Sequence, residues 1–375
     1  MYALLRPFLF NMDPEDAHRA VLRLLRVAPR FCINAKLPTS TALKQTLWGK
    51  VFHNPVGLAA GFDKNAEALS PLFCLGFGFV EAGTVTLKPQ DGNPRPRIFR
   101  DISNKAVINR MGFPNVGLAQ FKENVTVFLG IRPRTHGLLG INIGMNKDQT
   151  DPAHDYKALI RSLGGMADYL TINISSPNTP GLRNLQEKEP LRELLKAVMA
   201  ERAASCGHYP PPILVKLAPD LDETQMRDIA QVLLEEKVDG LILTNTTLSR
   251  PDFLPEGFKG ERGGLSGAPL TDLSTRIIAL FYTLTKGQIP IIGAGGILTA
   301  QDAYDKIRAG ATLIQVYSGL VYEGPELVQR IQSGLLELMK RDGFAHISQA
   351  VGTLSRDYAH PDTKNAGEEK HVHIA

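Results

Sequence analysis

Cysteine is scarce in this chain of 375 residues, and the three that occur stand far apart. Cys32, Cys74 and Cys206 form neither a CxxC pair nor a Cys/His spacing. The sequence therefore predicts no disulfide framework and no metal site, and a reducing compartment is the default.

Long apolar runs and an excess of one charge are also lacking. No run approaches the roughly 18 residues of a transmembrane helix, and no cleavage pattern follows a basic start, so we expect neither a membrane span nor a secretory signal. The 42 Lys and Arg residues nearly balance the 38 Asp and Glu residues, which leaves a net charge of +4. A charge this balanced gives no indication of a nucleic-acid partner.

The basic excess belongs to the N-terminal 50 residues, which carry eight basic and three acidic side chains, a net +5. Residues 2–10 are strongly apolar, and Asp13 followed by Pro14 predicts the start of a helix that ends near Pro29. Its apolar positions recur with helical spacing at Ala17, Ala20, Val21, Leu24, Leu25 and Ala28. A short apolar helix joined to a basic amphipathic one suits a membrane interface. The alternative is a helical pair packed on the main domain, with its arginines in water.

From residue 51 onward, short apolar runs alternate with helix-like stretches. Eight runs have the length and composition of strands: 56–61, 79–86, 138–144, 169–174, 213–218, 240–246, 289–293 and 313–317. Helices are predicted between them, including 191–202, 222–236 with Asp220 and Glu223 as a capping box, and 300–309. The simplest architecture is α/β, a (β/α)8 TIM barrel with an N-terminal helical extension. We expect residues 89–113 to form a hairpin over the top of the barrel and residues 47–54 another beneath it.

Polar residues stand at the C-terminal ends of these strands, where barrels bind ligands. They are the run from Ala59 to Lys64, then Thr84, Asn142, Asn173, Lys216, the run Thr244 to Thr246, the glycines from Gly293 to Gly296, and Tyr317 to Gly319. A lysine or asparagine in an otherwise apolar strand needs a buried partner. Something large and polar is therefore expected in the barrel mouth. The polar segment 173–178 is also compatible with an ordinary turn between strand and helix.

Glycines after the seventh and eighth strands expose backbone N–H groups where barrels commonly hold a phosphate, and residues 263–267 could add more. They are not a Rossmann fingerprint, because they close a barrel strand. A phosphate there, with Lys216 on the fifth strand and amides on the third and fourth, suits flavin mononucleotide (FMN). Lys216 would stabilise the reduced flavin near its N1 atom. Alternatively, Lys216 forms a buried ion pair and Lys64 is a solvated loop charge.

Several motifs follow one another along the chain: Ala60-Gly-Phe-Asp-Lys64, Asn109-Arg-Met-Gly-Phe113, Ile141-Asn-Ile-Gly144, Asn173-Ile-Ser-Ser-Pro-Asn-Thr-Pro-Gly-Leu-Arg183, Val215-Lys-Leu-Ala-Pro-Asp220, Thr244-Asn-Thr-Thr247, Leu265-Ser-Gly267 and Tyr317-Ser-Gly319. In this order they closely resemble dihydroorotate dehydrogenase of the quinone-dependent, membrane-associated class 2, over roughly residues 1–342.

The resemblance implies oxidation of (S)-dihydroorotate to orotate in de novo pyrimidine (UMP) biosynthesis, with electrons passing through bound FMN to a membrane quinone. It implies a peripheral membrane protein on the cytoplasmic face of the cell (inner) membrane, with no nucleic-acid partner, and it is compatible with a monomer.

The resemblance also assigns roles to residues. The matching cofactor positions are Ala59, Ala60, Gly61, Phe62, Asp63, Lys64, Thr84, Asn142, Asn173, Lys216, Thr244, Gly267, Gly296, Tyr317 and Ser318. The matching substrate positions are Lys64, Asn109, Arg110, Met111, Gly112, Phe113, Asn173, Asn178, Asn245 and Thr246. Ser176 matches the catalytic base, where the soluble class has a cysteine, and Thr179 and Phe113 match its neighbours. His18 and Arg100 match positions near the quinone tunnel.

The chemistry of these residue types agrees with the assignment. An asparagine amide both donates and accepts, as a pyrimidinedione edge requires, and Lys64 can bind the orotate carboxylate. We expect residues 1–40 to serve the membrane and quinone, residues 41–342 to form the catalytic barrel, and residues 343–375 to be a disordered or peripheral extension. Three alternatives stay open: a soluble flavin dehydrogenase using fumarate or a nicotinamide, a lyase with a Schiff base on Lys216, and a non-catalytic binding module.

Overall fold

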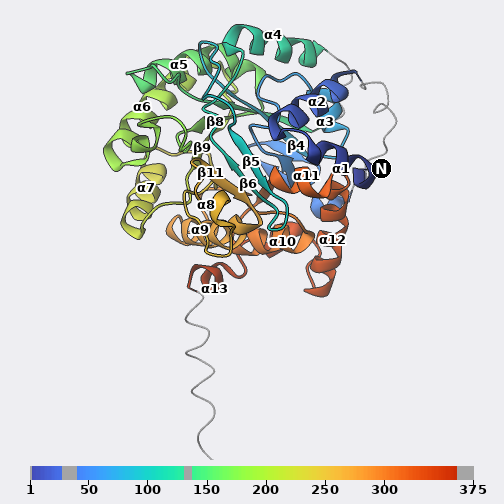
Figure 1. Ribbon diagram of the computed structural model, residues 1–375. Coiled ribbons are helices and arrows are strands. Elements are labelled where there is room, and N and C mark those ends of the chain that lie inside the picture. The colour runs from blue at the N-terminus through green and yellow to red at the C-terminus, as the bar shows by residue number, and fades with distance from the viewer. Residues whose placement is uncertain (1, 28–39, 131–136, 361–375) are drawn as a thin grey trace, which may run out of the picture.

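Eight parallel strands close into a barrel in the computed structural model, which describes residues 2–27, 40–130 and 137–360 (Figure 1). In their order around the barrel the strands are β3 (Val56–Leu58), β4 (Phe79–Val85), β7 (Leu138–Ile143), β8 (Tyr169–Asn173), β9 (Ile213–Leu217), β10 (Gly240–Leu243), β12 (Ile291–Ala294) and β13 (Leu313–Val316). Every residue of these strands except Leu138 is buried, because parallel strands are covered on both faces. The (β/α)8 prediction is confirmed, and seven of the eight strands begin at the predicted residue.

Helices form the outer ring of the barrel (Figure 1). They are α3 (Leu69–Phe73), α4 (Gly117–Gly130), α5 (Pro152–Leu163), α6 (Lys188–Ser205), α7 (Glu223–Glu235), α9 (Thr271–Leu284), α10 (Ala300–Ala309), α11 (Ser318–Glu323) and α12 (Leu327–Arg341). The short helix α8 (Glu256–Lys259) lies at the end of the barrel and not in this ring. Short 3-10 turns lie between some of them: η2 (Thr41–Leu43), η3 (Gly164–Met166), η4 (Leu182–Gln186) and η5 (Ala268–Leu270).

The capping box predicted at the start of α7 is wrong by two residues. Asp222 caps this helix, and its side chain and that of Gln225 each bind the other's backbone N–H. Asp220 is engaged elsewhere, because it accepts hydrogen bonds from Thr247 and Arg183.

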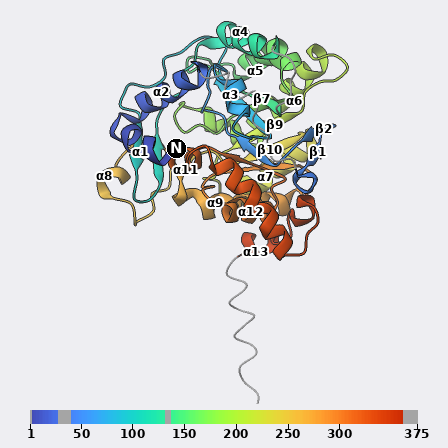
Figure 2. The same cartoon turned by 90° about the vertical axis from the view of Figure 1, so that its right-hand side faces the viewer.

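Both predicted hairpins are present, at opposite ends of the barrel. Strands β1 (Gln45–Leu47) and β2 (Lys50–Phe52) pair beneath it, where Trp48 donates to the carbonyl of Asp239 at 2.8 Å. Strands β5 (Ile98–Asp101) and β6 (Ala106–Asn109) pair over the top and are joined by β11 (Gly264–Gly267), which we did not predict. Figure 2 shows β1 and β2 at one end, with α1, α2 and α8 at the other.

The N-terminal segment forms α1 (Tyr2–Asn11) and α2 (Pro14–Val27). Asp13 caps α2 as predicted, accepting from the N–H of Glu15 at 2.9 Å. The buried carboxylate of Glu15 forms an ion pair with Arg97 at 2.8 Å and so ties α2 to the segment before β5. The predicted helix end near Pro29 lies outside the described residues. Across the described ranges, no helix combines the length and the hydrophobicity needed to cross a membrane.

The segment after α12 packs on the outside of the barrel as far as residue 360, which is the peripheral form of the two that were predicted for this extension. It forms η6 (Ile347–Ala350) and α13 (Ser355–Ala359), and α13 lies against α9 and α10. The N–H of Gly352 donates to the carbonyl of Ile307 at 3.0 Å. Residues 361–375 lie outside the described part.

Candidate active site

The C-terminal ends of the barrel strands open into a cavity of about 580 Å³ that is also lined by residues of α1 and α2. Most of the predicted cofactor and substrate residues line it: Ala59, Ala60, Gly61, Phe62, Lys64, Thr84, Asn109, Met111, Gly112, Phe113, Asn173, Ser176, Asn178, Lys216, Thr244, Asn245, Thr246, Gly267, Gly296, Tyr317 and Ser318. His18 and Arg100 line the same cavity at its other end. The structure therefore brings residues from all parts of the barrel, and from the N-terminal helices, to one space.

Three predicted site residues do not line the cavity. Arg110 turns outward, pairs with Glu261 and stacks on Phe99. Asp63 is buried and accepts from two backbone N–H groups just before α3, and its burial raises its pKa to about 6. Asn142 lies in the barrel interior, behind Thr84. These three side chains position the wall of the cavity.

A hydrogen-bond network fixes the amides at the barrel mouth. Asn142 donates to the buried carboxylate of Glu81 at 2.7 Å, so its oxygen faces the mouth and accepts from Thr84 at 2.6 Å. Asn173 donates to the Thr84 hydroxyl at 3.0 Å and to the Asn142 oxygen at 3.1 Å. The Asn173 oxygen accepts from Ser175 at 2.9 Å. Each amide therefore has one defined orientation, which a binding site needs to tell donors from acceptors.

Lys216 presents a buried ammonium group to the cavity. Its side chain is 6% exposed, and it makes no hydrogen bond or ion pair with any residue that the structure describes. Burial lowers the pKa of Lys216, while the charge of Glu81 opposes that shift. The buried ion pair that the sequence left open is thus not formed within the described residues. A buried ammonium without an acceptor is unfavourable, so this position fits a ligand with an electron-rich edge.

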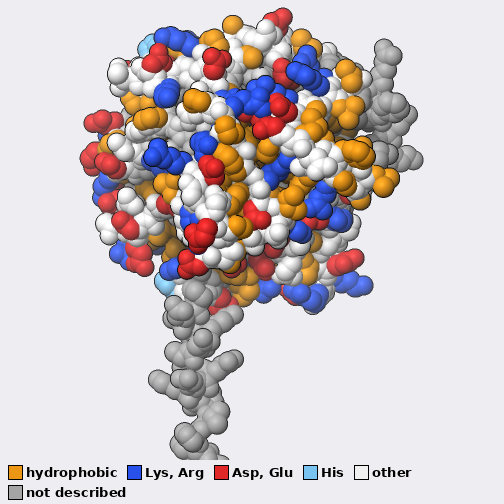
Figure 3. Space-filling view, viewed as in Figure 1, with side chains coloured by type: hydrophobic (Ala, Val, Ile, Leu, Met, Phe, Trp, Pro, Cys, Tyr) orange, Lys and Arg blue, Asp and Glu red, His pale blue; other side chains and the backbone are white. Residues whose placement is uncertain are grey.

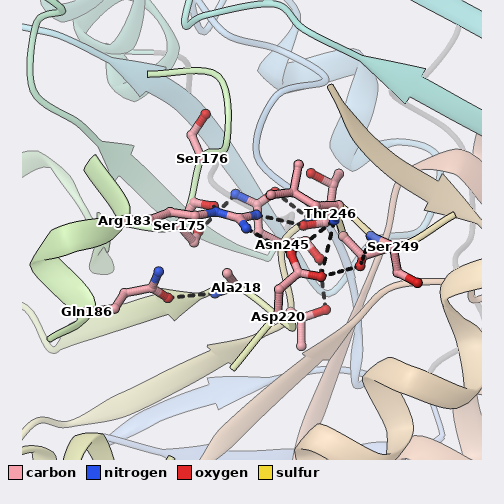
Figure 4. A network of polar contacts seen from close by, with 12 residues as sticks. Ser175, Ser176, Arg183, Gln186, Ala218, Asp220, Asn245, Thr246 and Ser249 are labelled. Carbon is pink, nitrogen blue, oxygen red and sulfur yellow. Dashed lines mark hydrogen bonds and ion pairs between the residues drawn. The ribbon is translucent and has the colours of Figure 1, made fainter. Parts of the chain in front are cut away.

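The loop after β8 carries Ser176 and is held from behind by Arg183 (Figure 4). Arg183 donates to the carbonyl of Ser175 at 3.1 Å, to the carbonyl of Thr246 at 3.1 Å and to Asp220 at 2.8 Å. Figure 4 shows Ser176 directed away from this network, and its side chain lines the cavity. The clamp therefore holds the loop while leaving the Ser176 hydroxyl available.

Lys64, in the segment after β3, and His18, on α2, lie along one wall of the cavity. Lys64 donates to the carbonyl of Gly61 at 2.5 Å, and burial lowers the pKa of Lys64 to about 8, so it stays mostly charged at neutral pH. His18 lies 2.8 Å from the carbonyl oxygen of Phe62, and burial lowers the pKa of His18 to about 4. Because a carbonyl oxygen only accepts, the Nε2 atom of this neutral imidazole carries the proton.

Arg100 joins the hairpin over the barrel to the end of α1. Its guanidinium donates to the carbonyl oxygens of Met12 at 2.7 Å and Phe10 at 3.2 Å, and it lies over the Phe10 ring at 4.6 Å. A cation at the C-terminal end of a helix satisfies carbonyls that lack partners within the helix. Arg100 thus fixes α1 over the apolar part of the cavity.

A cradle of glycines and hydroxyls closes the cavity near the ends of β12 and β13. Gly295 and Gly296 have φ values of 110° and 69°, and a Cβ on Gly296 would lie 2.6 Å from the backbone nitrogen of Thr271. The hydroxyl of Ser318 lies 2.9 Å from that of Ser266. Close backbone approach and convergent donors fit a phosphate group.

Some lining residues were missed by the sequence predictions. Ser266 and Gly295 line the cavity and belong to motifs that the sequence analysis names, so their position in these motifs could have identified them. Gln315 faces inward from β13 and carried no signal of its own. The apolar stripe of α2 was identified as a helix face, and Ala17, Ala20, Val21, Leu24 and Leu25 all line the cavity.

Fold and site together define the class: a TIM-barrel enzyme whose mouth is arranged for a large polar ligand with a phosphate at one end. The comparisons with known proteins then identify the family. The family model described as dihydroorotate dehydrogenase matches residues 42–339. The chain belongs to the dihydroorotate dehydrogenase family, which excludes the lyase and the non-catalytic alternatives.

Similar proteins cover nearly the whole chain. Dihydroorotate dehydrogenase (quinone) of Rhodospirillum rubrum is 51% identical over 356 residues, which is 95% of this chain and 95% of that protein. The mitochondrial dihydroorotate dehydrogenase (quinone) of Mus musculus is 49% identical, over 91% of this chain and 87% of that protein. The crystal structure of DHODH from Eimeria tenella in complex with ferulenol matches with a TM-score of 0.87 and 41% identity, and covers 93% of this chain and 98% of that chain.

Proposed function

We propose that this protein oxidises (S)-dihydroorotate to orotate, with FMN bound in the barrel mouth and a membrane quinone as acceptor, in de novo pyrimidine (UMP) biosynthesis. The observation that carries the proposal is one continuous cavity with two chemically different ends. The barrel end is lined by amides, hydroxyls and two lysines, and the other end by the apolar faces of α1 and α2. The relatives named as quinone enzymes support the same acceptor and disfavour the soluble-acceptor alternative.

The residues at the barrel mouth fit FMN. Lys216 offers the unpaired ammonium that an electron-rich ring edge requires, and Thr84 and Asn173 supply oriented hydrogen-bonding groups beside it. The cradle around Gly296 and Ser318 would take the phosphate. Bound there, FMN would supply the two-electron redox chemistry that links oxidation of the substrate to reduction of the quinone.

The remaining polar residues suit dihydroorotate. Lys64 would bind the carboxylate through charge-assisted hydrogen bonds, and Asn109, Asn178 and Asn245 would bind the ring edges. Ser176 would remove the proton at C5. Its side chain is 4% exposed, and exclusion of water makes a weak base more effective. Thr179 would assist proton removal, as it carries a further buried hydroxyl in the same loop.

The helix end suits a lipid-soluble acceptor. Leu4, Phe8, Leu24 and Val27 are 77%, 73%, 60% and 81% exposed, and Figure 3 shows hydrophobic side chains on the side of the molecule where α1 and α2 lie. We propose that residues 1–40 rest on the cytoplasmic face of the inner membrane and admit the quinone, that residues 41–342 form the catalytic barrel, and that the protein acts as a monomer. His18 and Arg100 would border the quinone path.

Two successive spectra test the proposal. The purified protein should be yellow, and anaerobic addition of dihydroorotate should bleach its visible flavin absorbance. A quinone added next should restore the absorbance, whereas fumarate or NAD⁺ should not. Colourless protein, or bleached protein that only fumarate or NAD⁺ reoxidises, would contradict the proposal.

A further inference from the structure

A second buried lysine lies behind the glycine cradle, outside the cavity. Lys306 on α10 has no exposed surface, and its ammonium donates to the carbonyl of Thr271 at 3.1 Å and to the hydroxyls of Ser274 at 2.5 Å and Thr275 at 2.9 Å. All three acceptors are neutral. No carboxylate of the described residues lies within ion-pair distance of this group. The ammonium therefore has hydrogen-bond acceptors but no neighbouring negative charge.

Two of the three residues that accept from Lys306, Ser274 and Thr271, also bind the backbone of the cradle. Ser274 donates to the carbonyl of Gly295 at 3.0 Å, and Thr271 donates to the carbonyl of Gly296 at 2.8 Å. A Cβ on Gly293 would lie 3.4 Å from the Cβ of Lys306. The ammonium is thus separated from the cradle by a single layer of hydrogen-bonded groups.

Among the residues that the structure describes, none that forms the cradle carries a positive charge. Its lining near the ends of β12 and β13 consists of glycines, Ser318, Tyr317 and apolar side chains, together with Ser266 from β11. Lys216 belongs to β9, and the polar groups beside it are Thr84 and Asn173 of β4 and β8. A phosphate monoester dianion bound in the cradle would therefore meet neutral donors only, unless a charge behind them contributes.

We propose that Lys306 supplies the counter-charge of the FMN phosphate, acting across the Ser274 and Thr271 layer without touching it. This inference rests on the proposed function, because it requires FMN in the barrel mouth. Burying an isolated ammonium is unfavourable, and a buried dianion nearby offsets that cost, so each charge explains the presence of the other. Lys306 is a positioning and charge-compensating residue, since it contacts neither substrate nor flavin.

The surrounding charges agree with this role. Burial lowers the pKa of Lys306 to about 7, and the carboxylates of Asp302, Asp272 and Asp305 counteract the shift only from a distance. Without an anion in the cradle, the surroundings therefore stabilise the charged form of Lys306 only weakly. The competing explanation is a purely structural one, in which Lys306 joins α9 to α10 through its three hydrogen bonds.

Comparing FMN with riboflavin separates the two explanations, because riboflavin lacks the phosphate and keeps the ring. We would measure the dissociation constants of both for the full chain freed of flavin. The variants are Lys306→Met, which removes charge and hydrogen bonds, and Lys306→Gln, which removes the charge and keeps donors. Thr275→Val is the matched control, because it removes one of the three hydrogen bonds of the Lys306 ammonium, together with the bond from Thr275 to the carbonyl of Thr271, and keeps the charge.

Both Lys306 variants should weaken FMN by about a hundredfold or more, as expected for the loss of a full charge facing a dianion across several ångströms at an effective dielectric constant of about 20. Riboflavin should stay within about twofold, and Thr275→Val should leave the ratio of the two constants unchanged. An unchanged ratio in Lys306→Met or Lys306→Gln, or an equal loss for both flavins, would overturn the inference. Failure of the unmodified chain to bind FMN would instead overturn the proposed function.

Discussion

The two ends of the cavity are built on different physical principles. At the barrel end, the amides of Asn142 and Asn173 are oriented by hydrogen bonds to neighbouring strands, as Asn142 is by Glu81 and Thr84. At the helix end the lining is apolar, and Leu24 is 60% exposed. An oriented polar site selects one small ligand, whereas an apolar path accepts a flexible lipid-soluble one. The difference indicates that the two half-reactions can be changed separately.

The attachment of the two ends also differs. The barrel end belongs to a continuous hydrogen-bonded sheet, whereas α2 is held by side-chain contacts, which include the buried ion pair between Glu15 and Arg97 and the surface pairs of Arg95. The helix end should therefore be the first part to detach under stress.

Removing the proposed catalytic base should impair only the half-reaction at the barrel end, and it is the largest effect we expect. Ser176→Ala should slow flavin reduction by dihydroorotate by about 10²- to 10⁴-fold, the usual loss for a general base. FMN content and reoxidation of chemically reduced flavin by quinone should be unchanged. Anaerobic stopped-flow bleaching measures the first rate, and bleaching near the rate of the unmodified protein would rule out the role of Ser176.

Breaking the buried ion pair loosens only the helix end. Glu15→Gln leaves Arg97 without its carboxylate and should destabilise the docking of α2 by about 3 kcal/mol. Hydrogen exchange over residues 14–27 measures the effect, with Asp16→Asn as the control, since its exposed pair with Arg95 contributes at most about 1 kcal/mol. Equal protection of α2 in both variants would show that the ion pair does not hold the helix.

Within the barrel end, Lys216 should matter for the flavin ring. Lys216→Ala should weaken FMN by roughly tenfold or more and shift the reduction potential of any flavin retained, because the cation beside the ring is lost. The exposed Lys340→Ala is the matched control. Flavin content and spectroelectrochemical titration measure both effects, and stoichiometric flavin with an unchanged potential would count against the assignment.

Acid should affect the helix end before the barrel, with a smaller effect than these substitutions. Burial lowers the pKa of His18 to about 4 from its usual 6.5, so its contribution to folding is present above pH 6.5 and is lost as pH falls toward 4. The hydrogen bond from Arg97 lowers the pKa of Glu15, so that contribution disappears only below its usual value of 4.5. Protection of α2 against exchange should therefore decline from pH 6.5 downward. Protection that stays constant to pH 4 would contradict the buried, neutral state of His18.

Much of the barrel could be predicted from the sequence, because its strands are buried apolar runs of distinctive length. The polar mouth was predictable for a similar reason: a charge such as Lys216 in an apolar strand stands out. What could not be predicted depends on distant partners. The partners of Glu81 come from three other strands, and β11 exists only because it pairs with β6.

The cap of α7 and the form of the segment after α12 could not be decided from the sequence, for the same reason. Asp220 and Asp222 are both good caps by sequence, and the choice between them depends on Arg183 and Thr247, which occupy Asp220. The segment after α12 is polar in composition. The few side chains through which it packs on the barrel, such as Ile347, do not recur with a helix or strand spacing. Long-range contacts decided both cases.

The most direct test of the central claim measures both half-reactions on one preparation that lacks residues 1–40. Rapid mixing with dihydroorotate follows flavin reduction, and mixing of the reduced protein with a quinone follows reoxidation, while retained FMN shows that the barrel is folded. We predict flavin reduction at the rate of the full chain and loss of most quinone reoxidation. This is the opposite of the pattern expected for Ser176→Ala, in which reduction is slow and reoxidation is unchanged. Quinone reoxidation at the rate of the full chain would show that α1 and α2 only pack on the barrel. It would contradict the claim that the two half-reactions depend on different ends of the cavity.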